Sequence, residues 1–295
     1  MNNQAKAYSY AAFTILFWGT AATAFKLALR DISPLELLIV SNSVAFIILL
    51  GVVLIGGKRN QLIPRTRKEV GRSALLGFLN PFAYYLVLFE AYTRLPAQLA
   101  QPLNFVWPIA LVLLSVPLLK QTLNRMDVAA LLVSFAGVYL LASQGSPFNL
   151  VFADGIGVFL ALFSSVIWAL FWLFNMKDQR DAAVKLCLNF FFSLIFVLLL
   201  ALFTGRFPTS WTFGMSAAVY VGIFEMGVTF VLWLNALKFA RSTAQMGNII
   251  YLTPFVALFF VHLILHEYIY YTTFIGLVFI IIGILIQRKY GTKHG

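Results

Sequence analysis

The sequence predicts an all-α integral membrane protein with ten transmembrane helices, arranged as two inverted repeats of five helices each. Three observations lead to this prediction. Of the 295 residues, 61% are hydrophobic and 11% are charged, and the mean hydropathy is +0.90, values that do not fit the water-facing surface of a soluble domain. Ten apolar stretches of about 20 residues follow one another, each long enough to cross a bilayer core about 30 Å thick. The second half of the chain also repeats the pattern of the first.

The ten apolar stretches leave little chain for a further globular domain. Long apolar runs such as Phe190 to Phe203 do not alternate in the way that the strands of a membrane β-barrel do. Helices are therefore expected throughout. Their expected limits are 8–28, 34–56, 72–93, 97–119, 126–144, 154–176, 184–204, 212–237, 243–265 and 270–288.

Several expected helix starts carry capping residues. In Ser33-Pro34-Leu35-Glu36, the serine, the proline at the first helical position and the glutamate at the third together satisfy the free amides of a starting helix. Glu36 therefore needs no functional explanation. Pro96 and Asp154 are expected to open the fourth and sixth helices, and the stretch from Ser242 to Gln245 repeats the capping pattern before the ninth.

The basic residues predict the orientation of the chain. If both termini are cytoplasmic, 17 of the 21 lysines and arginines lie on the cytoplasmic side, and only Lys26, Arg30, Arg94 and Arg206 lie opposite. This asymmetry is what the positive-inside rule requires. The net charge of +11 is therefore read as a topological signal, and no nucleic-acid partner is expected.

An internal repeat divides the chain into residues 1–147 and 148–295. An offset of 146 places Pro108 over Pro254 and Gly137 over Gly283, and Trp18 aligns with Trp168 at an offset of 150. Five helices in each half mean that the second copy enters the membrane upside down, an arrangement typical of transporters that alternate access around a central site. The repeat also argues against reading the first span, with Ala22-Thr23-Ala24 at its end, as a cleaved signal peptide.

A family resemblance rests on specific residues. The Phe17-Trp18-Gly19-Thr20 motif with Lys26, the duplicated five-helix unit and the run from Ser242 to Gln287 resemble the drug/metabolite transporter superfamily, of the EamA type. Within it the chain is most similar to bacterial aromatic-amino-acid exporters. One departure is that the first half has Gln121 where the second has the acidic Glu267.

The resemblance implies a ten-helix exporter in the inner membrane. It further implies a central cavity walled by the first, third, fourth, sixth, eighth and ninth helices, with the fifth and tenth helices serving as packing supports.

Away from the residues that begin the expected spans, two carboxylates lie inside them, where an ionisable group costs about 2.5–3.5 kcal/mol and so requires a role or a partner. Glu225 is near the middle of the eighth span. It either faces a water-filled cavity, where it attracts a substrate ammonium or carries a proton, or bonds to a neighbouring helix in a structural role. Glu90, near the end of the third span and close to Arg94, is expected to be a rim residue.

Amides, tyrosines and tryptophans supply the remaining candidates for substrate binding. Proline-kinked helices expose backbone groups that side chains or cavity water must satisfy, so the polar cluster on the third and fourth spans suits a substrate wall, although interhelical hydrogen bonding is an alternative. Aromatic walls suit a ring-bearing ligand. The candidate residues are Trp18, Asn80, Tyr84, Gln98, Asn104, Trp107, Trp168, Trp172, Glu225, Gln245, Asn248 and Tyr251.

Other functional classes lack their motifs. His262 and His266 stand four residues apart, but position 263 is leucine where a zinc-protease motif needs glutamate. The Gly56-Gly57-Lys58 sequence lacks the first glycine of a phosphate-binding loop. A single cysteine, Cys187, permits no intramolecular disulfide and no cysteine-based metal cluster. No metal, cofactor or catalytic residue is expected.

The sequence thus predicts a secondary transporter that exports small amphipathic metabolites, aromatic amino acids in particular, by alternating access. Its expected partners are this small-molecule substrate and membrane lipid, and its oligomeric state is left open. An intramembrane lipid-modifying enzyme and a channel are the alternatives. The enzyme is disfavoured because the spans contain no paired-carboxylate or His/Asp constellation.

Overall fold

The protein is a multi-pass helical membrane protein, as predicted. The computed structural model describes residues 3–64, 66–119, 124–148, 154–240 and 249–290, and each regular element assigned within them is a helix. Eight helical stretches are long and apolar enough to cross a membrane, and two further apolar helices, Ile250–Leu265 and Tyr271–Ile286, are shorter. The count of ten spans stays a prediction, because the expected start of the ninth lies outside the described residues.

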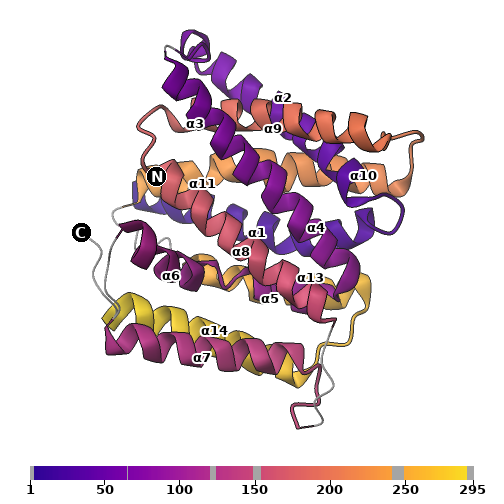
Figure 1. Ribbon diagram of the computed structural model, residues 1–295, viewed down its shortest axis with the longest axis vertical. Coiled ribbons are helices and arrows are strands. Elements are labelled where there is room, and N and C mark those ends of the chain that lie inside the picture. The colour runs from indigo at the N-terminus through magenta and orange to yellow at the C-terminus, as the bar shows by residue number, and fades with distance from the viewer. Residues whose placement is uncertain (1–2, 65, 120–123, 149–153, 241–248, 291–295) are drawn as a thin grey trace.

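The helices follow the expected stretches closely. The first half contains α1 (Asn3–Ala28), α2 (Pro34–Ile55), η1 (Arg59–Gln61), α3 (Arg67–Gly77), η2 (Phe78–Ala83), α4 (Tyr84–Arg94), α5 (Ala97–Asn104), α6 (Trp107–Leu119) and α7 (Arg125–Ala142). The second contains α8 (Gly155–Met176), α9 (Ala182–Thr204), α10 (Phe213–Tyr220), η3 (Val221–Gly227), α11 (Val228–Phe239), η4 (Ile250–Leu252), α13 (Thr253–Leu265) and α14 (Tyr271–Tyr290). Figure 1 shows these helices running across the view, from α2, α3 and α9 at the top to α7 and α14 at the bottom.

The predicted helix caps are present where the structure describes them. The Ser33 hydroxyl accepts a hydrogen bond from the Glu36 backbone N–H, and the Glu36 carboxylate accepts one from the Ser33 N–H at 2.8 Å. Asp154 caps α8 by accepting bonds from the N–H groups of Ile156 and Gly157. The expected cap from Ser242 to Gln245 lies outside the described residues.

Three of the membrane-crossing stretches are interrupted partway. The third breaks at Asn80, whose φ of −147° and ψ of 121° are non-helical, immediately before Pro81. The fourth breaks between Asn104 and Trp107, and the eighth contains the π-helical turn η3. Such turns within helices are frequent at functional sites because they re-aim side chains and free backbone groups.

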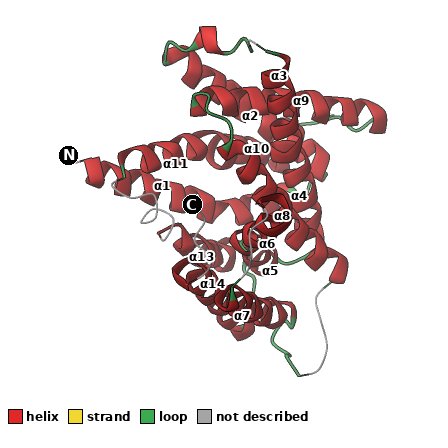
Figure 2. Ribbon diagram, turned by 60° about the vertical axis from the view of Figure 1, so that its left-hand side comes forward, coloured by secondary structure: helices red, strands yellow, loops and turns green. Residues whose placement is uncertain are grey.

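The helices α7 and α14 form a pair at one side of the molecule. They lie side by side in Figures 1 and 2 and contact each other extensively. Their backbones approach so closely that a Cβ atom on Gly137 would lie 2.6 Å from the Gly276 carbonyl oxygen, which only glycine permits. At the opposite side α9 packs against α2 and α3, and between these two groups α1 and α8 each contact several helices. The helix α1 contacts α10, α11 and α13, and α8 contacts α4, α5 and α6.

A candidate substrate cavity

A cavity of about 240 Å³ lies between the two halves of the chain. The side chains that line it come mainly from α1, α4, α5, α6, α8, η3, α11, η4 and α13. These helices belong to the first, third, fourth, sixth, eighth and ninth apolar stretches. The volume is slightly below the roughly 300–1,000 Å³ typical of pockets for drug-sized ligands. A small molecule of one or two rings therefore suits it.

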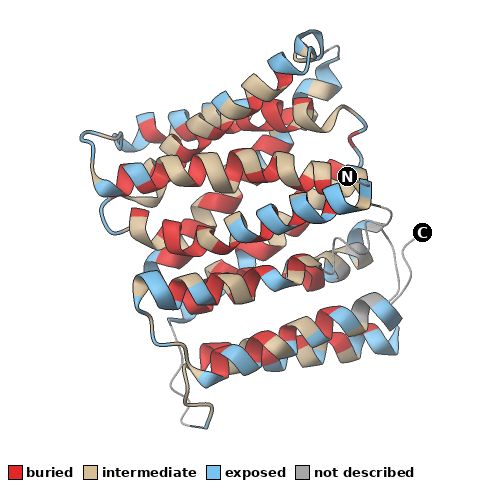
Figure 3. Cartoon of the chain, turned by 180° about the vertical axis from the view of Figure 1, so that it is seen from behind, coloured by how far each residue is buried: buried red, intermediate tan, exposed pale blue. Residues whose placement is uncertain are grey.

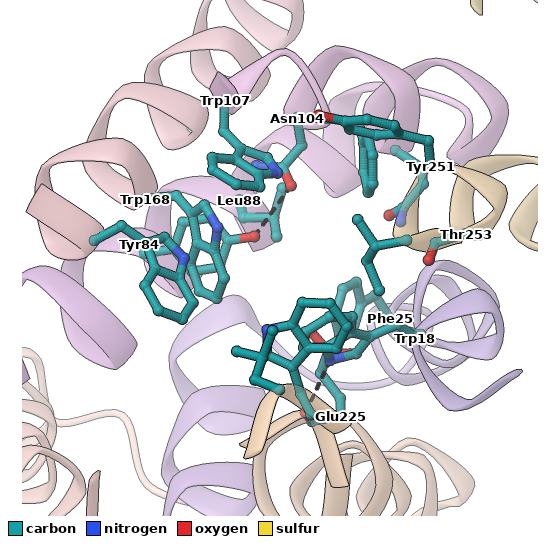
Figure 4. Close-up of a pocket in the computed structure, with 17 residues that line it drawn as sticks. Trp18, Phe25, Tyr84, Leu88, Asn104, Trp107, Trp168, Glu225, Tyr251 and Thr253 are labelled. Atoms are coloured by element: carbon teal, nitrogen blue, oxygen red, sulfur yellow. Dashed lines mark hydrogen bonds between the residues drawn. The ribbon is translucent and has the colours of Figure 1, made fainter. Parts of the chain in front are cut away.

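Eight of the twelve predicted site residues line this cavity. In Figure 4, Tyr84, Trp107 and Trp168 lie on one side of the open centre, Tyr251 on the other, and Trp18 and Glu225 at the lower edge. The eight are Trp18, Tyr84, Asn104, Trp107, Trp168, Trp172, Glu225 and Tyr251. Gln245 and Asn248 lie outside the described residues.

Two predicted residues do not line the cavity. Asn80 is completely buried at the break in the third stretch, about one helical turn before Tyr84. Gln98 is also buried, but its side chain bonds to the connection between α13 and α14 instead of facing the cavity. The polarity of Gln98 signalled its buried hydrogen-bonding role but not which space it faces, whereas neither polar atom of the Asn80 side chain has a hydrogen-bond partner among the described residues.

The cavity wall is largely aromatic. Trp168 is central to it, with its ring centroid 4.7 Å from that of Tyr84 and 6.0 Å from that of Trp172. At the lower edge in Figure 4, the ring centroid of Trp18 lies 6.0 Å from that of Trp233. Rings at these separations are within the range of favourable offset and edge-to-face contacts. A flat apolar ligand would find contact surface on several sides.

A short chain of hydrogen bonds fixes part of this wall. The Tyr84 hydroxyl donates to Asn104 Oδ1 at 3.0 Å, and Asn104 Nδ2 donates to Ser164 Oγ at 2.8 Å. The chain links α4, α5 and α8. Asn104 therefore fulfils both interpretations offered for the amides, because it lines the cavity and also joins neighbouring helices.

Glu225 is the one acidic side chain lining the cavity, and no lysine or arginine lines it among the described residues. The Tyr85 hydroxyl donates to Glu225 Oε1 at 3.0 Å, and Trp18 Nε1 lies 3.4 Å from the Glu225 backbone oxygen. Both proposed environments of Glu225 are thus present, since it borders the cavity and bonds to a neighbouring helix. The π-helical turn η3 places it there.

Several apolar lining residues carried no signal in the sequence. Phe25 and Leu88 border the cavity but cannot be told from the many apolar residues that face lipid. Thr253 and Gln101 also line it. Gln101 is a polar residue of the fourth stretch and Thr253 of the ninth. Their polarity within apolar stretches was the sequence signal that could have identified them as lining residues.

Residues from both halves meet at the start of α5, about one helical turn from Gln101 of the cavity wall. The Glu267 carboxylate accepts bonds from the backbone N–H groups of Ala97 and Gln98 at 3.0 and 3.2 Å, and so caps α5 from 170 residues away. The Gln98 side chain donates to the Tyr268 carbonyl oxygen at 2.7 Å and accepts from the Tyr270 N–H at 3.1 Å. We call these contacts of Glu267 and Gln98 the α5 latch.

Glu90 is not among the residues that line the cavity, and its position near the membrane interface stays a prediction. Its carboxylate is 3.0 Å from Arg94 Nε, and both side chains are partly exposed. Arg94 also lies 3.7 Å from Asp154 at the start of α8. An exposed pair of this kind contributes about 0–1 kcal/mol to stability.

Comparisons with known proteins identify the family. An uncharacterized transporter of Clostridium kluyveri is 27% identical over 98% of this chain and 94% of its own. An aromatic amino acid exporter of Ancylobacter novellus is 29% identical over 53% of this chain and 55% of its own. A solved crystal structure aligns with a TM-score of 0.67 over 96% of each chain at 21% identity, which shows a shared fold. The model of the EamA-like transporter family matches residues 5–143 and 155–287, and the chain therefore belongs to that family.

Proposed function

We propose that this transporter exports small amphipathic metabolites that carry an apolar ring, with aromatic amino acids as the first candidates. The observation that carries the proposal is the aromatic cavity between the two halves, with Trp168 in its wall. An apolar pocket with a few placed polar groups is the usual way to bind such a molecule. The exporter of Ancylobacter novellus that resembles half of this chain adds support for the substrate class.

We further propose that transport proceeds by alternating access of two halves, residues 1–147 and 148–295. Both halves contribute walls to the cavity, and the two segments matched by the family model fall on either side of residue 148. Sites at the interface of inverted repeats are common in carriers that rock around a fixed binding site. A single chain would then form the transport unit.

The charge of the cavity favours a cargo with an amino group. Glu225 is the acidic side chain of the wall, and the absence of a basic one among the described lining residues leaves a carboxylate of the cargo without a charged partner. Neutral donors such as the Trp172 indole and the Thr253 hydroxyl remain for it. An aromatic amine should therefore compete with an aromatic amino acid, whereas the corresponding keto acid should compete poorly.

The proposed location is the inner membrane, with both termini in the cytoplasm. The asymmetric placement of lysines and arginines supports this orientation. Export would then run from the side that carries the termini to the opposite side.

Counterflow in proteoliposomes tests the substrate proposal. Vesicles loaded with unlabelled tryptophan should accumulate labelled tryptophan, the rate should saturate, and phenylalanine and tryptamine should compete. Saturation with counterflow distinguishes a carrier from a channel. If tryptophan flux equals that of empty liposomes while small polar amino acids are carried, the aromatic assignment is wrong.

A matched pair of variants tests the cavity. Trp168→Ala removes a central ring and should raise the half-saturating tryptophan concentration about tenfold or more, which corresponds to about 1.4 kcal/mol of binding free energy. Trp211→Ala is the control, because Trp211 is 75% exposed and does not line the cavity. The proposal fails if both variants bind tryptophan equally well.

A further inference from the structure

The connection between α2 and α3 presents basic and apolar side chains together on the surface. Ile55 is 91% exposed and Ile63 is 75% exposed. Arg59, Arg67 and Lys68, interleaved with them along the chain, are exposed as well. We call these five residues the basic–apolar surface. It lies at the tip that stands out at the upper right of Figure 3.

The three cations of this surface have no acidic partner among the residues that the structure describes. The neighbouring Lys58 and Arg72 are different. Lys58 Nζ lies 2.6 Å from the Asp181 carboxylate, and Arg72 Nη1 lies 3.9 Å from that of Asp178. No carboxylate of the described residues lies within ion-pair distance of Arg59, Arg67 or Lys68. The segment therefore keeps part of its positive charge available for an external anion.

We propose that the basic–apolar surface binds the headgroups of anionic phospholipids in the adjoining leaflet. Ile55 ends the membrane-crossing helix α2, so the surface lies where the chain leaves the membrane. Exposed apolar residues at that level enter the interface, while clustered lysines and arginines attract anionic headgroups. Neither feature alone selects this ligand, because the isoleucines fit any lipid and the cations fit any anion. Their combination fits an anionic lipid.

Contacts behind the surface connect it to the rest of the fold. Lys58 pairs with Asp181, the cap of α9. Arg72 Nη1 donates to the Lys177 carbonyl oxygen at 3.2 Å, in the link between α8 and α9. A headgroup that holds the α2–α3 connection would therefore also restrain the start of α9. Lipid binding should raise the thermal stability of the whole chain, because a ligand that binds only the folded state stabilises it.

The single cysteine supplies a readout of this stabilisation. Cys187 is 1% exposed within α9, so a thiol-reactive fluorophore reports its exposure as the purified protein unfolds. The protein in a neutral detergent would be titrated with phosphatidylglycerol, with phosphatidylcholine and with inorganic phosphate. We expect phosphatidylglycerol to raise the unfolding temperature more than phosphatidylcholine, and inorganic phosphate to have little effect. Equal shifts with the two lipids, or a comparable shift with inorganic phosphate, would overturn the proposal.

Charge-neutral variants locate the site. In Arg59→Gln/Arg67→Gln/Lys68→Gln, the phosphatidylglycerol concentration that gives half of the shift should rise about a hundredfold, at roughly fivefold for each cation near an anionic surface. The control is Arg30→Gln/Arg125→Gln/Arg206→Gln, which removes three exposed arginines dispersed over the molecule. Its half-effective concentration should change less than threefold. Equal changes in the two triple variants would place the lipid elsewhere.

Two further measurements do not depend on the triple variant folding. The wild-type shift with phosphatidylglycerol should shrink as salt rises from about 0.01 M to about 1 M, because the Debye length falls from about 30 Å to about 3 Å. Ile63→Ser should weaken the response to both lipids, since it removes apolar contact without changing charge. A shift that is independent of salt would contradict the role of the cations.

Discussion

The α5 latch predicts that Glu267→Gln opens one end of the cavity more often. The carboxylate accepts two backbone bonds at the start of α5, where the helix dipole also favours negative charge. Glutamine keeps the shape of the side chain and one acceptor oxygen, but it removes the negative charge. Its amide N–H group would then face one of the two backbone N–H donors of α5, with which it cannot form a hydrogen bond. Opening of this end would separate α5 from the α13–α14 connection and break these bonds. The substitution therefore destabilises the closed state and leaves the stability of the open state unchanged.

The magnitude follows from these two bonds. A hydrogen bond to a charged group contributes about 1.5–3 kcal/mol, and one acceptor of two is retained. Glu267 is partly exposed, which places the loss of free energy at the lower end of this range, at about 1.5 kcal/mol. This loss raises the ratio of open to closed molecules about tenfold.

Thiol labelling of a cavity residue measures this ratio. In a Cys187→Ala background, cysteine is introduced at Leu88, which lines the cavity and is 2% exposed. A membrane-impermeant maleimide should label it about tenfold faster when Glu267→Gln is added. The control is Glu90→Gln, the same chemical change in the exposed pair with Arg94, which should alter the rate less than twofold. Equal labelling with and without Glu267→Gln would refute the latch.

Three further predictions concern coupling, acid stability and orientation. If Glu225 carries a coupled proton, Glu225→Gln should lose transport driven by a pH gradient yet keep counterflow, whereas wild-type behaviour in both assays would make Glu225 structural. Burial raises the pKa of Asp178, but hydrogen bonds from Arg180 outweigh this and hold the pKa below its usual value. The stabilisation is therefore present above about pH 4 and is lost as the pH falls further, so Asp178→Asn should lower the unfolding temperature at pH 7 but make little difference near pH 2. Cysteine at Asn60 should be shielded from an impermeant reagent in intact cells while cysteine at Gln144 reacts, and the reverse pattern would invert the topology.

The membrane-crossing stretches could be predicted because the bilayer imposes both their length and their composition. The break at Asn80 could also be anticipated, since Pro81 follows it. The π-helical turn from Val221 to Gly227 could not. It contains no proline. Gly222 within it lies so close to α2 that an added Cβ atom would be 2.7 Å from the Ser41 carbonyl oxygen, and the local sequence does not reveal such a tertiary contact.

The residues of the candidate site likewise include some that the sequence could predict and some that it could not. Tryptophans and amides within apolar stretches are rare enough to attract attention, and most of those selected line the cavity. Phe25 lines it too, but an apolar ring is equally suited to lipid, to the core or to the cavity, and only the packing of α1 decides among them. Gln98 shows the opposite limit. Its polarity correctly indicated a buried hydrogen-bonding role, but its partners lie about 170 residues away, so the sequence alone could not distinguish a residue that binds substrate from one that holds the two halves together.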